Sequence, residues 1–188
     1  MTLYSIKNIK SSINFVLLLL LSFTNLAQVN KDFPEIEGTT LNDSIVNIPK
    51  DTKGKYTLVG MAYSKKAEDD LNTWFEPVYR TFIHKSDKPS LFAVNYDINL
   101  YFIPMFTGAN KAVAGKATKK MKDGIDKKLQ PYVLVFSGKM EDYKSVLNLG
   151  QKDVPYFFVL DKNGKIIYAT SGKFTEDKLE QIEELIEE

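Results

Sequence analysis

Cysteine and histidine, two residue types that often carry covalent or acid–base chemistry, are almost absent from this sequence. The chain has 188 residues, no cysteine and one histidine, His84. Without cysteine it can form no disulfide and has neither a thiolate nucleophile nor a thiolate metal ligand. A single histidine also rules out a multi-histidine metal site. With thiol chemistry and histidine metal sites excluded, the nucleophile left to consider is a serine activated by an adjacent base.

Ser64 is the serine best placed for such a role. It follows the apolar run Tyr56–Tyr63 and precedes a helical pattern, so it lies at a strand-to-helix turn. A serine hydroxyl needs an adjacent base, and the sequence has no Gly-x-Ser-x-Gly elbow. His84 falls at the end of the following helix, where a capping or surface role is expected. We therefore predict a helix N-cap at Ser64 and no catalytic residue, metal ligand or cofactor.

The elements around Ser64 have the order of an α/β protein. Tyr56–Tyr63 is typical of a strand buried on both faces. From Ala67 to Phe82 the apolar residues recur at helical spacing and predict an amphipathic helix. Leu91–Asp97 is expected to be the next strand, parallel to the first, and Tyr132–Gly138 a further buried strand.

The C-terminal third predicts a hairpin and a closing helix. Tyr156–Leu160 forms a short apolar run, and Asn163-Gly164 in the following turn permits the positive φ of a tight hairpin. The return strand is expected at 165–169. Thr175 then resembles an N-cap, and the spacing of the apolar residues predicts a final helix with an acidic outer side. The apolar residues of that helix are Leu179, Ile182, Leu185 and Ile186.

The N-terminal 27 residues have the layout of a signal peptide. Lys7 and Lys10 precede the unbroken apolar run Phe15–Leu21, and Ala27 offers a small residue for cleavage. The alternative is an uncleaved membrane anchor, although the run is short for a bilayer span. We expect residues 1–27 to be a signal peptide and 28–188 one domain that is exported, periplasmic or secreted. The net charge of +1 gives no field that favours nucleic acid.

Residues 98–130 differ in composition and are interpreted as a helical insertion. The segment Lys111–Lys128 contains seven lysines and two aspartates, with a rough helical stripe of apolar residues. Three interpretations remain open: a solvated amphipathic helix over the core, a docking surface for an acidic partner, and contact with an anionic membrane surface.

Several short motifs together resemble the thioredoxin-like superfamily. Within it, the chain resembles the mitochondrial ATP-synthase assembly-factor family and, in its opening hairpin, exported peroxiredoxin-like and thioredoxin-like proteins. The matching residues are Phe33-Pro34, Gly38, Leu41, Gly54-Lys55, Leu58-Val59, Trp74, Pro77, Phe157–Asp161, Gly164–Ile166 and Gly172. The resemblance implies a thioredoxin-like fold of the α/β class: a central mixed sheet flanked by helices, with an N-terminal β-hairpin and the helical insertion.

The resemblance also implies a functional surface. In redox relatives the turn at 63–68 carries Cys-x-x-Cys and faces a cis-proline, here Pro155. We call the corresponding residues the Ser64 face: Tyr63, Ser64, Lys65, Lys66, Ala67, Val154 and Pro155. Because thiols are absent, we expect this face to bind a protein partner, by strand addition beside the proline, in an assembly or chaperone-like role. The alternatives are a thiol-independent peroxiredoxin- or oxidoreductase-like enzyme and a stabilising subunit with no site of its own.

Overall fold

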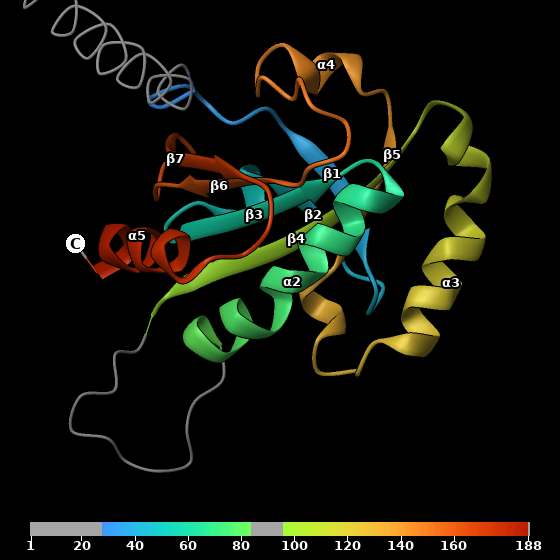
Figure 1. Ribbon diagram of the computed structural model, residues 1–188, viewed down its shortest axis with the longest axis horizontal. Helices are drawn as coiled ribbons and strands as arrows, with labels where there is room; N and C mark the ends of the chain where they lie inside the picture. The colour runs from blue at the N-terminus through green and yellow to red at the C-terminus, as the bar shows by residue number, and fades with distance from the viewer. Residues whose placement is uncertain (1–27, 84–95, 188) are drawn as a thin grey trace, which may run out of the picture.

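A computed structural model describes residues 28–83 and 96–187 of the 188-residue chain. The predicted signal peptide, His84 and residues 91–95 of the predicted second strand lie outside the described residues. The elements in chain order are β1 (Ile36–Thr40), β2 (Ile45–Ile48), η2 (Lys50–Thr52), β3 (Tyr56–Ala62), α2 (Lys65–Phe82), β4 (Ile98–Thr107), η3 (Gly108–Val113), α3 (Ala114–Gly124), η4 (Gln130–Tyr132), β5 (Leu134–Gly138), α4 (Glu141–Lys144), β6 (Tyr156–Leu160), β7 (Ile166–Ser171) and α5 (Glu176–Glu187) (Figure 1).

The described strands form one mixed sheet in the order β2-β1-β5-β4-β3-β6-β7. Strand β4 runs parallel to both β3 and β5, whereas β6 is antiparallel to β3 and to β7. The predicted fold class is confirmed, because this mixed sheet with its flanking helices is thioredoxin-like. Within the described ranges, no helix combines the length and apolar character needed to cross a membrane.

Both predicted hairpins form, and turn chemistry explains each of them. Asp43 adopts a φ of 69° in the β1–β2 turn, and Gly164 a φ of 90° in the β6–β7 turn. One Asp161 carboxylate oxygen accepts the backbone N–H groups of Asn163 and Lys165, both at 2.8 Å. An aspartate that satisfies two turn donors in this way fixes the hairpin locally. The N-terminal hairpin joins the sheet where β1 pairs with β5.

The position of the strand parallel to β3 was wrongly predicted. Strand β4 begins at Ile98, paired with Tyr56, and its pairing with β3 ends at Pro104, opposite Ala62. Residues 98–107 therefore belong to the central sheet, and the predicted insertion at about 98–130 begins too early. Pro104 argues against a strand because it lacks an N–H. It is tolerated where the pairing of β4 with β3 ends, one residue before the pairing with β5 begins at Met105.

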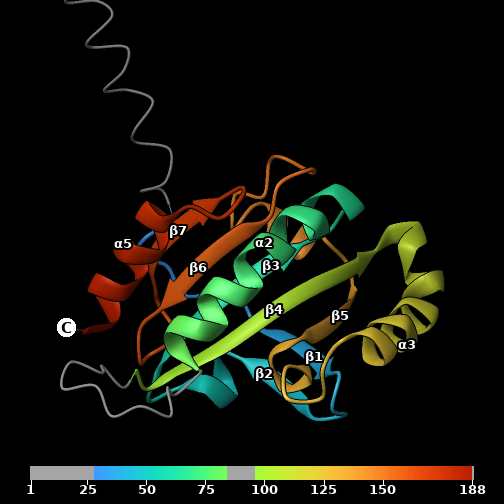
Figure 2. The ribbon, with the colours of Figure 1, turned by 60° about the horizontal axis from the view of Figure 1, so that its bottom comes forward.

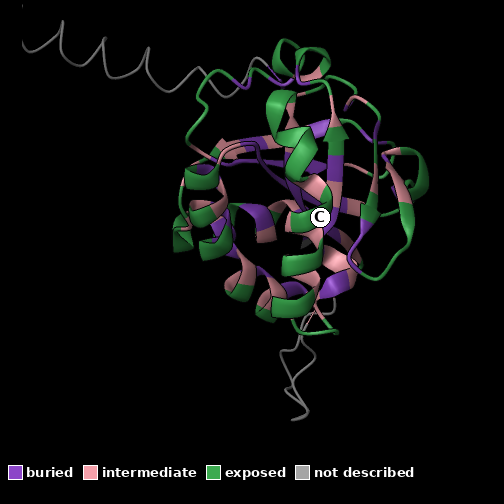
Figure 3. Cartoon of the chain, turned by 90° about the vertical axis from the view of Figure 1, so that its right-hand side faces the viewer, coloured by how far each residue is buried: buried purple, intermediate pink, exposed green. Residues whose placement is uncertain are grey.

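Two apolar clusters lie on opposite faces of the sheet. Helix α2 lies across one face, over β3 and β4 (Figure 2). One cluster lies beneath α2 and α5 and includes Trp74 and Phe157; the other lies beneath the N-terminal hairpin and the 140–149 segment and includes Phe158. The buried residues of α2 are Ala67, Leu71, Trp74, Val78 and Phe82, which confirms the predicted helical stripe. Burial is concentrated in the strands and on the inner sides of these helices (Figure 3). A helix packed in this way gives its first residue, beside Ser64, a fixed position.

Candidate partner-binding site

Ser64 forms the N-cap of α2, as predicted. Its backbone is extended, with φ −141° and ψ 160°, and its Oγ accepts the Ala67 N–H at 3.1 Å. This bond satisfies one of the free amide donors of the first helical turn. The same hydroxyl donates to a carboxylate oxygen of Asp153 at 3.0 Å. A serine bonded to a carboxylate without an imidazole is not an activated nucleophile, so this geometry favours a structural role.

The bond to Asp153 brings the two halves of the Ser64 face together. A second contact supports it, because the Tyr63 hydroxyl donates to the Leu149 carbonyl at 3.0 Å. The Tyr156 hydroxyl in turn accepts the Gln151 N–H at 2.6 Å. The bonds of Ser64 and Tyr63 attach the loop at 149–153 to the corner that precedes α2, and the bond of Tyr156 attaches the same loop to β6. Residues some ninety positions apart in the sequence thus lie side by side, as the resemblance implies.

The environment of Pro155 differs from the expectation. Among the described residues only the Ile48–Pro49 peptide bond is cis, so Val154–Pro155 is trans. Pro155 is also buried, and its carbonyl accepts the Gly172 N–H at 2.9 Å. Its backbone polar group is therefore already used by the link to the end of β7. The expected cis bond was therefore wrong, because Val154–Pro155 has the ordinary, lower-energy trans form. Strand addition beside this proline stays a prediction, and the Pro155 carbonyl already has a partner within the fold.

Only part of the Ser64 face is accessible to another protein. Lys65 and Lys66 are exposed, and Ser64 and Val154 are half-buried. The other three residues, Tyr63, Ala67 and Pro155, are buried beneath them. Lys65 bonds to Asp69 at 3.0 Å and to Glu68 at 3.6 Å, and the bond to Asp69 raises the pKa of its amine. The accessible surface is therefore small, and the charge of Lys65 within it is paired with acidic residues of α2.

Replacing Tyr63 with phenylalanine is expected to lower the free energy of unfolding by about 1 kcal/mol at neutral pH, because the buried Leu149 carbonyl loses its donor. Burial, with Tyr156 and Asp153 nearby, raises the pKa of the Tyr63 hydroxyl to about 12. A tyrosine whose pKa is higher in the folded chain stabilises the fold below the unfolded value of about 10, and that contribution is lost as the pH rises toward 12.

The wild type should therefore lose more stability than Tyr63→Phe between about pH 10 and pH 12. Urea unfolding at several pH values in this window measures the difference. The other tyrosines titrate in both proteins, so their contribution cancels in the comparison. Equal pH dependence in the two proteins would contradict the assigned environment of Tyr63.

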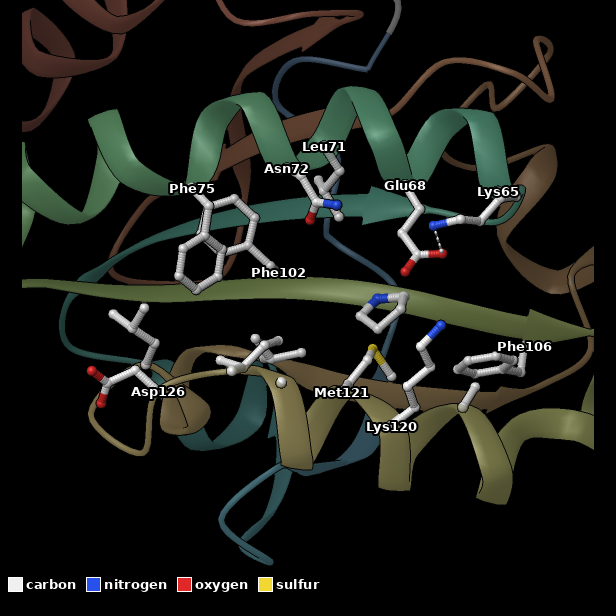
Figure 4. A pocket seen from close by; sticks show the side chains of 16 residues that line it. Lys65, Glu68, Leu71, Asn72, Phe75, Phe102, Phe106, Lys120, Met121 and Asp126 are labelled. Atoms are coloured by element: carbon white, nitrogen blue, oxygen red, sulfur yellow. Dashed lines mark ion pairs between the residues drawn. The ribbon is translucent and has the colours of Figure 1, made fainter.

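A groove that the sequence did not reveal lies beside the Ser64 face, between α2 and α3 and above β4 (Figure 4). It encloses about 650 Å³. Its apolar lining comes from all three elements and from the segment that follows α3. The apolar lining residues are Leu71, Phe75, Phe102, Pro104, Phe106, Ala117, Met121, Ile125, Leu129 and Val133. A second cavity of about 260 Å³ shares Lys65, Glu68 and Phe106 with it and reaches Tyr63 and Ser64. We call the two together the α2–α3 groove.

Helix α3 confirms the predicted helical stripe within Lys111–Lys128, but none of its residues is buried. It is attached at its C-terminal end, where the buried Gln130 side chain donates to the carbonyls of Lys122 at 2.9 Å and Ile125 at 3.0 Å. Lys122 also pairs with Asp43 of the β1–β2 turn. Helix α3 thus forms one wall of the groove and does not cover the core.

The described residues also bear on whether the chain has a metal site. In the ranges 28–83 and 96–187, no group of three or more histidine, cysteine, aspartate or glutamate side chains is placed to hold a metal ion. His84 lies outside those ranges. The sequence indicated Ser64 and its neighbours through the strand-to-helix pattern. Lys120 and Met121 of the groove were seen only as members of a basic helical segment.

Solved structures with a similar fold include proteins of thiol–disulfide chemistry. The thioredoxin domain of a thiol-disulfide oxidoreductase from Bacteroides vulgatus is 20% identical, with a TM-score of 0.53 over 84% of this chain and 97% of that chain. An exposed lipoprotein thioredoxin from Streptococcus pneumoniae is 14% identical, with a TM-score of 0.52 over 80% and 99%. The mitochondrial 2-Cys peroxiredoxin from Plasmodium falciparum is 14% identical, with a TM-score of 0.51 over 84% and 94%. These likenesses establish the fold.

No curated protein sequence matches the chain. The model of one protein family does, over residues 27–188, and it is described as ATP10 protein. The match extends over nearly all of the chain that follows the predicted signal peptide. It includes the Ser64 face, the α2–α3 groove and the closing helix. The resemblance noted from the sequence motifs is thereby confirmed: the chain belongs to the ATP10 protein family of ATP synthase assembly factors.

Proposed function

We propose that this protein is an exported, non-redox assembly factor that binds a protein partner through the accessible part of the Ser64 face. One observation carries the proposal. The fold that similar proteins use for disulfide chemistry has Ser64 and Ala67 at the turn where Cys-x-x-Cys is expected, and the whole chain lacks cysteine. An assembly factor acts by binding other proteins, so a scaffold of this kind could serve in such a family without transferring electrons.

The contact surface comprises Ser64, Lys65, Lys66 and Val154, with the buried members of the face as its support. Lys65 is paired with Glu68 and Asp69, so the charge that favours acidic side chains of a partner at this contact is that of the exposed Lys66. Export is supported by the pattern of residues 1–27, with a basic start, an apolar run and a small residue at Ala27. Assembly of the ATP synthase is the first process to test, because the family is described by it.

A deletion strain of the source organism tests this function. Without the gene, the amount of assembled ATP synthase on a native gel should fall severalfold, and the wild-type gene should restore it. Lys65→Glu/Lys66→Glu should fail to restore it because the contact surface changes sign. Lys162→Glu/Lys165→Glu is the matched control: it makes the same charge change on exposed lysines of the β6–β7 hairpin and should complement fully.

Full assembly in the deletion strain would overturn the proposed role in ATP synthase assembly. Equal complementation by both double variants would show that the Ser64 face is not needed for that role. A parallel insulin-reduction and peroxide-consumption assay addresses the oxidoreductase alternative. Turnover above a heat-killed control would contradict the non-redox proposal.

A further inference from the structure

The α2–α3 groove has an apolar lining that the described part of the chain leaves partly uncovered. Ala117, Met121 and Ile125 line it from α3 and its C-cap, and each is only half-buried. The 11-residue helix α3 buries none of its residues. Helices of this length are marginal in water and gain most of their stability by packing an apolar side. A ligand that covers this stripe would supply the packing that α3 lacks.

The opposite wall and the floor of the groove are aromatic. Phe75 of α2 and Phe102 of β4 contact each other with ring centroids 4.6 Å apart, and Phe106 lies farther along β4 (Figure 4). Toward the Ser64 face the second cavity adds Val113, a valine with 52% of its surface exposed. An elongated apolar trough between two helices is the usual receptor for an amphipathic helix, whose anchors recur every three or four residues.

The charged residues around the groove indicate the charge of the ligand that would fit it. Helix α3 contains four lysines against one aspartate, namely Lys116, Lys119, Lys120 and Lys122 against Asp123. Lys120 is exposed and lines the groove itself. Asp126 lines the same side, but its carboxylate is paired with Lys128 at 3.9 Å. Lys65, at the other rim, is paired with acidic residues of α2. The free positive charge is therefore concentrated on the α3 side, where acidic side chains beside an apolar stripe would be complementary.

We propose that the α2–α3 groove binds an acidic amphipathic helix of the partner protein. This inference rests on the proposed function and names the partner segment that the neighbouring groove recognises. Two segments of this chain that could be considered as occupants do not fit. Residues 1–27 contain Lys7 and Lys10 and no acidic residue. Helix α5 is acidic, but Leu179 and Ile182 on its apolar side are already buried against the sheet.

The proposal is tested by measuring the binding of a synthetic peptide to the protein expressed from the full-length sequence. The peptide is a helix of about 18 residues, with leucines at helical spacing flanked by glutamates and a fluorescent label. Fluorescence anisotropy should show saturable binding, which is lost when the glutamates are replaced by lysines. Met121→Gln should weaken binding about tenfold because an apolar contact is lost.

A matched pair of charge variants locates the contact. Lys120→Gln and Lys119→Gln remove the same charge from adjacent exposed residues of α3, but only Lys120 lines the groove. We expect Lys120→Gln to weaken binding about fivefold and Lys119→Gln less than about twofold. Equal effects of the two variants would overturn the proposal, since they would indicate general attraction to a basic surface.

The remaining outcomes separate this inference from the proposed function. If no peptide binds, but the Lys65→Glu/Lys66→Glu strain still fails to assemble its complex, the groove inference is wrong and the assembly role stands. If the peptide binds as expected but the deletion strain assembles normally, the assembly role is wrong and the groove specificity stands. If the protein binds phosphatidylglycerol vesicles but not the peptide, the proposal is overturned in favour of a lipid surface. If the protein self-associates and Met121→Gln abolishes this, the proposal is overturned in favour of a second copy of the chain.

Discussion

Replacing Trp74 with alanine is expected to lower the free energy of unfolding by about 3–5 kcal/mol. The indole is completely buried and stacks on Phe157 with ring centroids 3.9 Å apart. Phe174 meets it edge-on at 5.6 Å, and its Nε1 donates to the Gly172 carbonyl at 2.9 Å. The substitution therefore leaves a cavity and removes the donor to Gly172.

Urea unfolding followed by circular dichroism measures this effect, because Trp74 is the only tryptophan and its fluorescence disappears in the variant. Trp74→Phe is the control: it keeps an aromatic ring against Phe157 and should cost clearly less. A loss below about 1 kcal/mol for Trp74→Ala would show that the stack does not hold α2 on the sheet. The Ser64 face depends on this packing, since Ser64 caps the same helix.

Gly60→Ala is expected to destabilise the protein by about 1–3 kcal/mol through overpacking. A Cβ atom at residue 60 of strand β3 would lie 2.6 Å from Cε1 of Phe157 and 3.0 Å from Cδ1 of Leu71. Both neighbours are buried, and the stacked Trp74 ring prevents Phe157 from moving away. The extra methyl group must therefore displace side chains of the cluster beneath α2.

Chemical unfolding of Gly60→Ala and a control glycine variant tests this prediction. Gly150→Ala is the control, because a Cβ there meets no heavy atom within 4 Å and should change stability by less than about 0.5 kcal/mol. The double variant Trp74→Ala/Gly60→Ala gives a further check. The space left by the lost indole should let Phe157 move away from the added methyl group. The double variant should therefore lose less unfolding free energy than the sum of the losses in the two single variants. Full additivity would mean that the two sites do not share this cluster.

The elements predicted correctly from sequence are those whose signals are local. The apolar spacing from Ala67 to Phe82 defined α2, and the turn residues Asn163-Gly164 defined the β6–β7 hairpin. Strand β4 was placed too early because the apolar run at 91–94 competed with the one at 98–107. Which of the two apolar runs becomes the strand depends on its pairing with β3, and strand pairing cannot be deduced from a local sequence pattern.

The candidate site was predicted only where the resemblance supplied long-range information. It placed Ser64 beside the segment before Pro155, and the bond from Ser64 to Asp153 agrees with that placement. Local sequence does not reveal the trans bond of Pro155, nor that its carbonyl accepts the N–H of the distant residue Gly172. The α2–α3 groove was missed for a similar reason. Its walls come from α2, β4 and α3, and α3 is positioned by the distant residue Asp43 and by Gln130.

The central claim, that a thioredoxin-like scaffold without thiols binds a protein at the Ser64 face, is tested most directly by site-specific photocrosslinking in the source organism. A benzophenone amino acid replaces Lys66, which is exposed beside Ser64, or Lys162, which is exposed at the opposite end of β6. We predict one protein adduct, identical in every replicate, from residue 66 and none from residue 162. No adduct from residue 66, or the same adducts from both residues, would contradict the account.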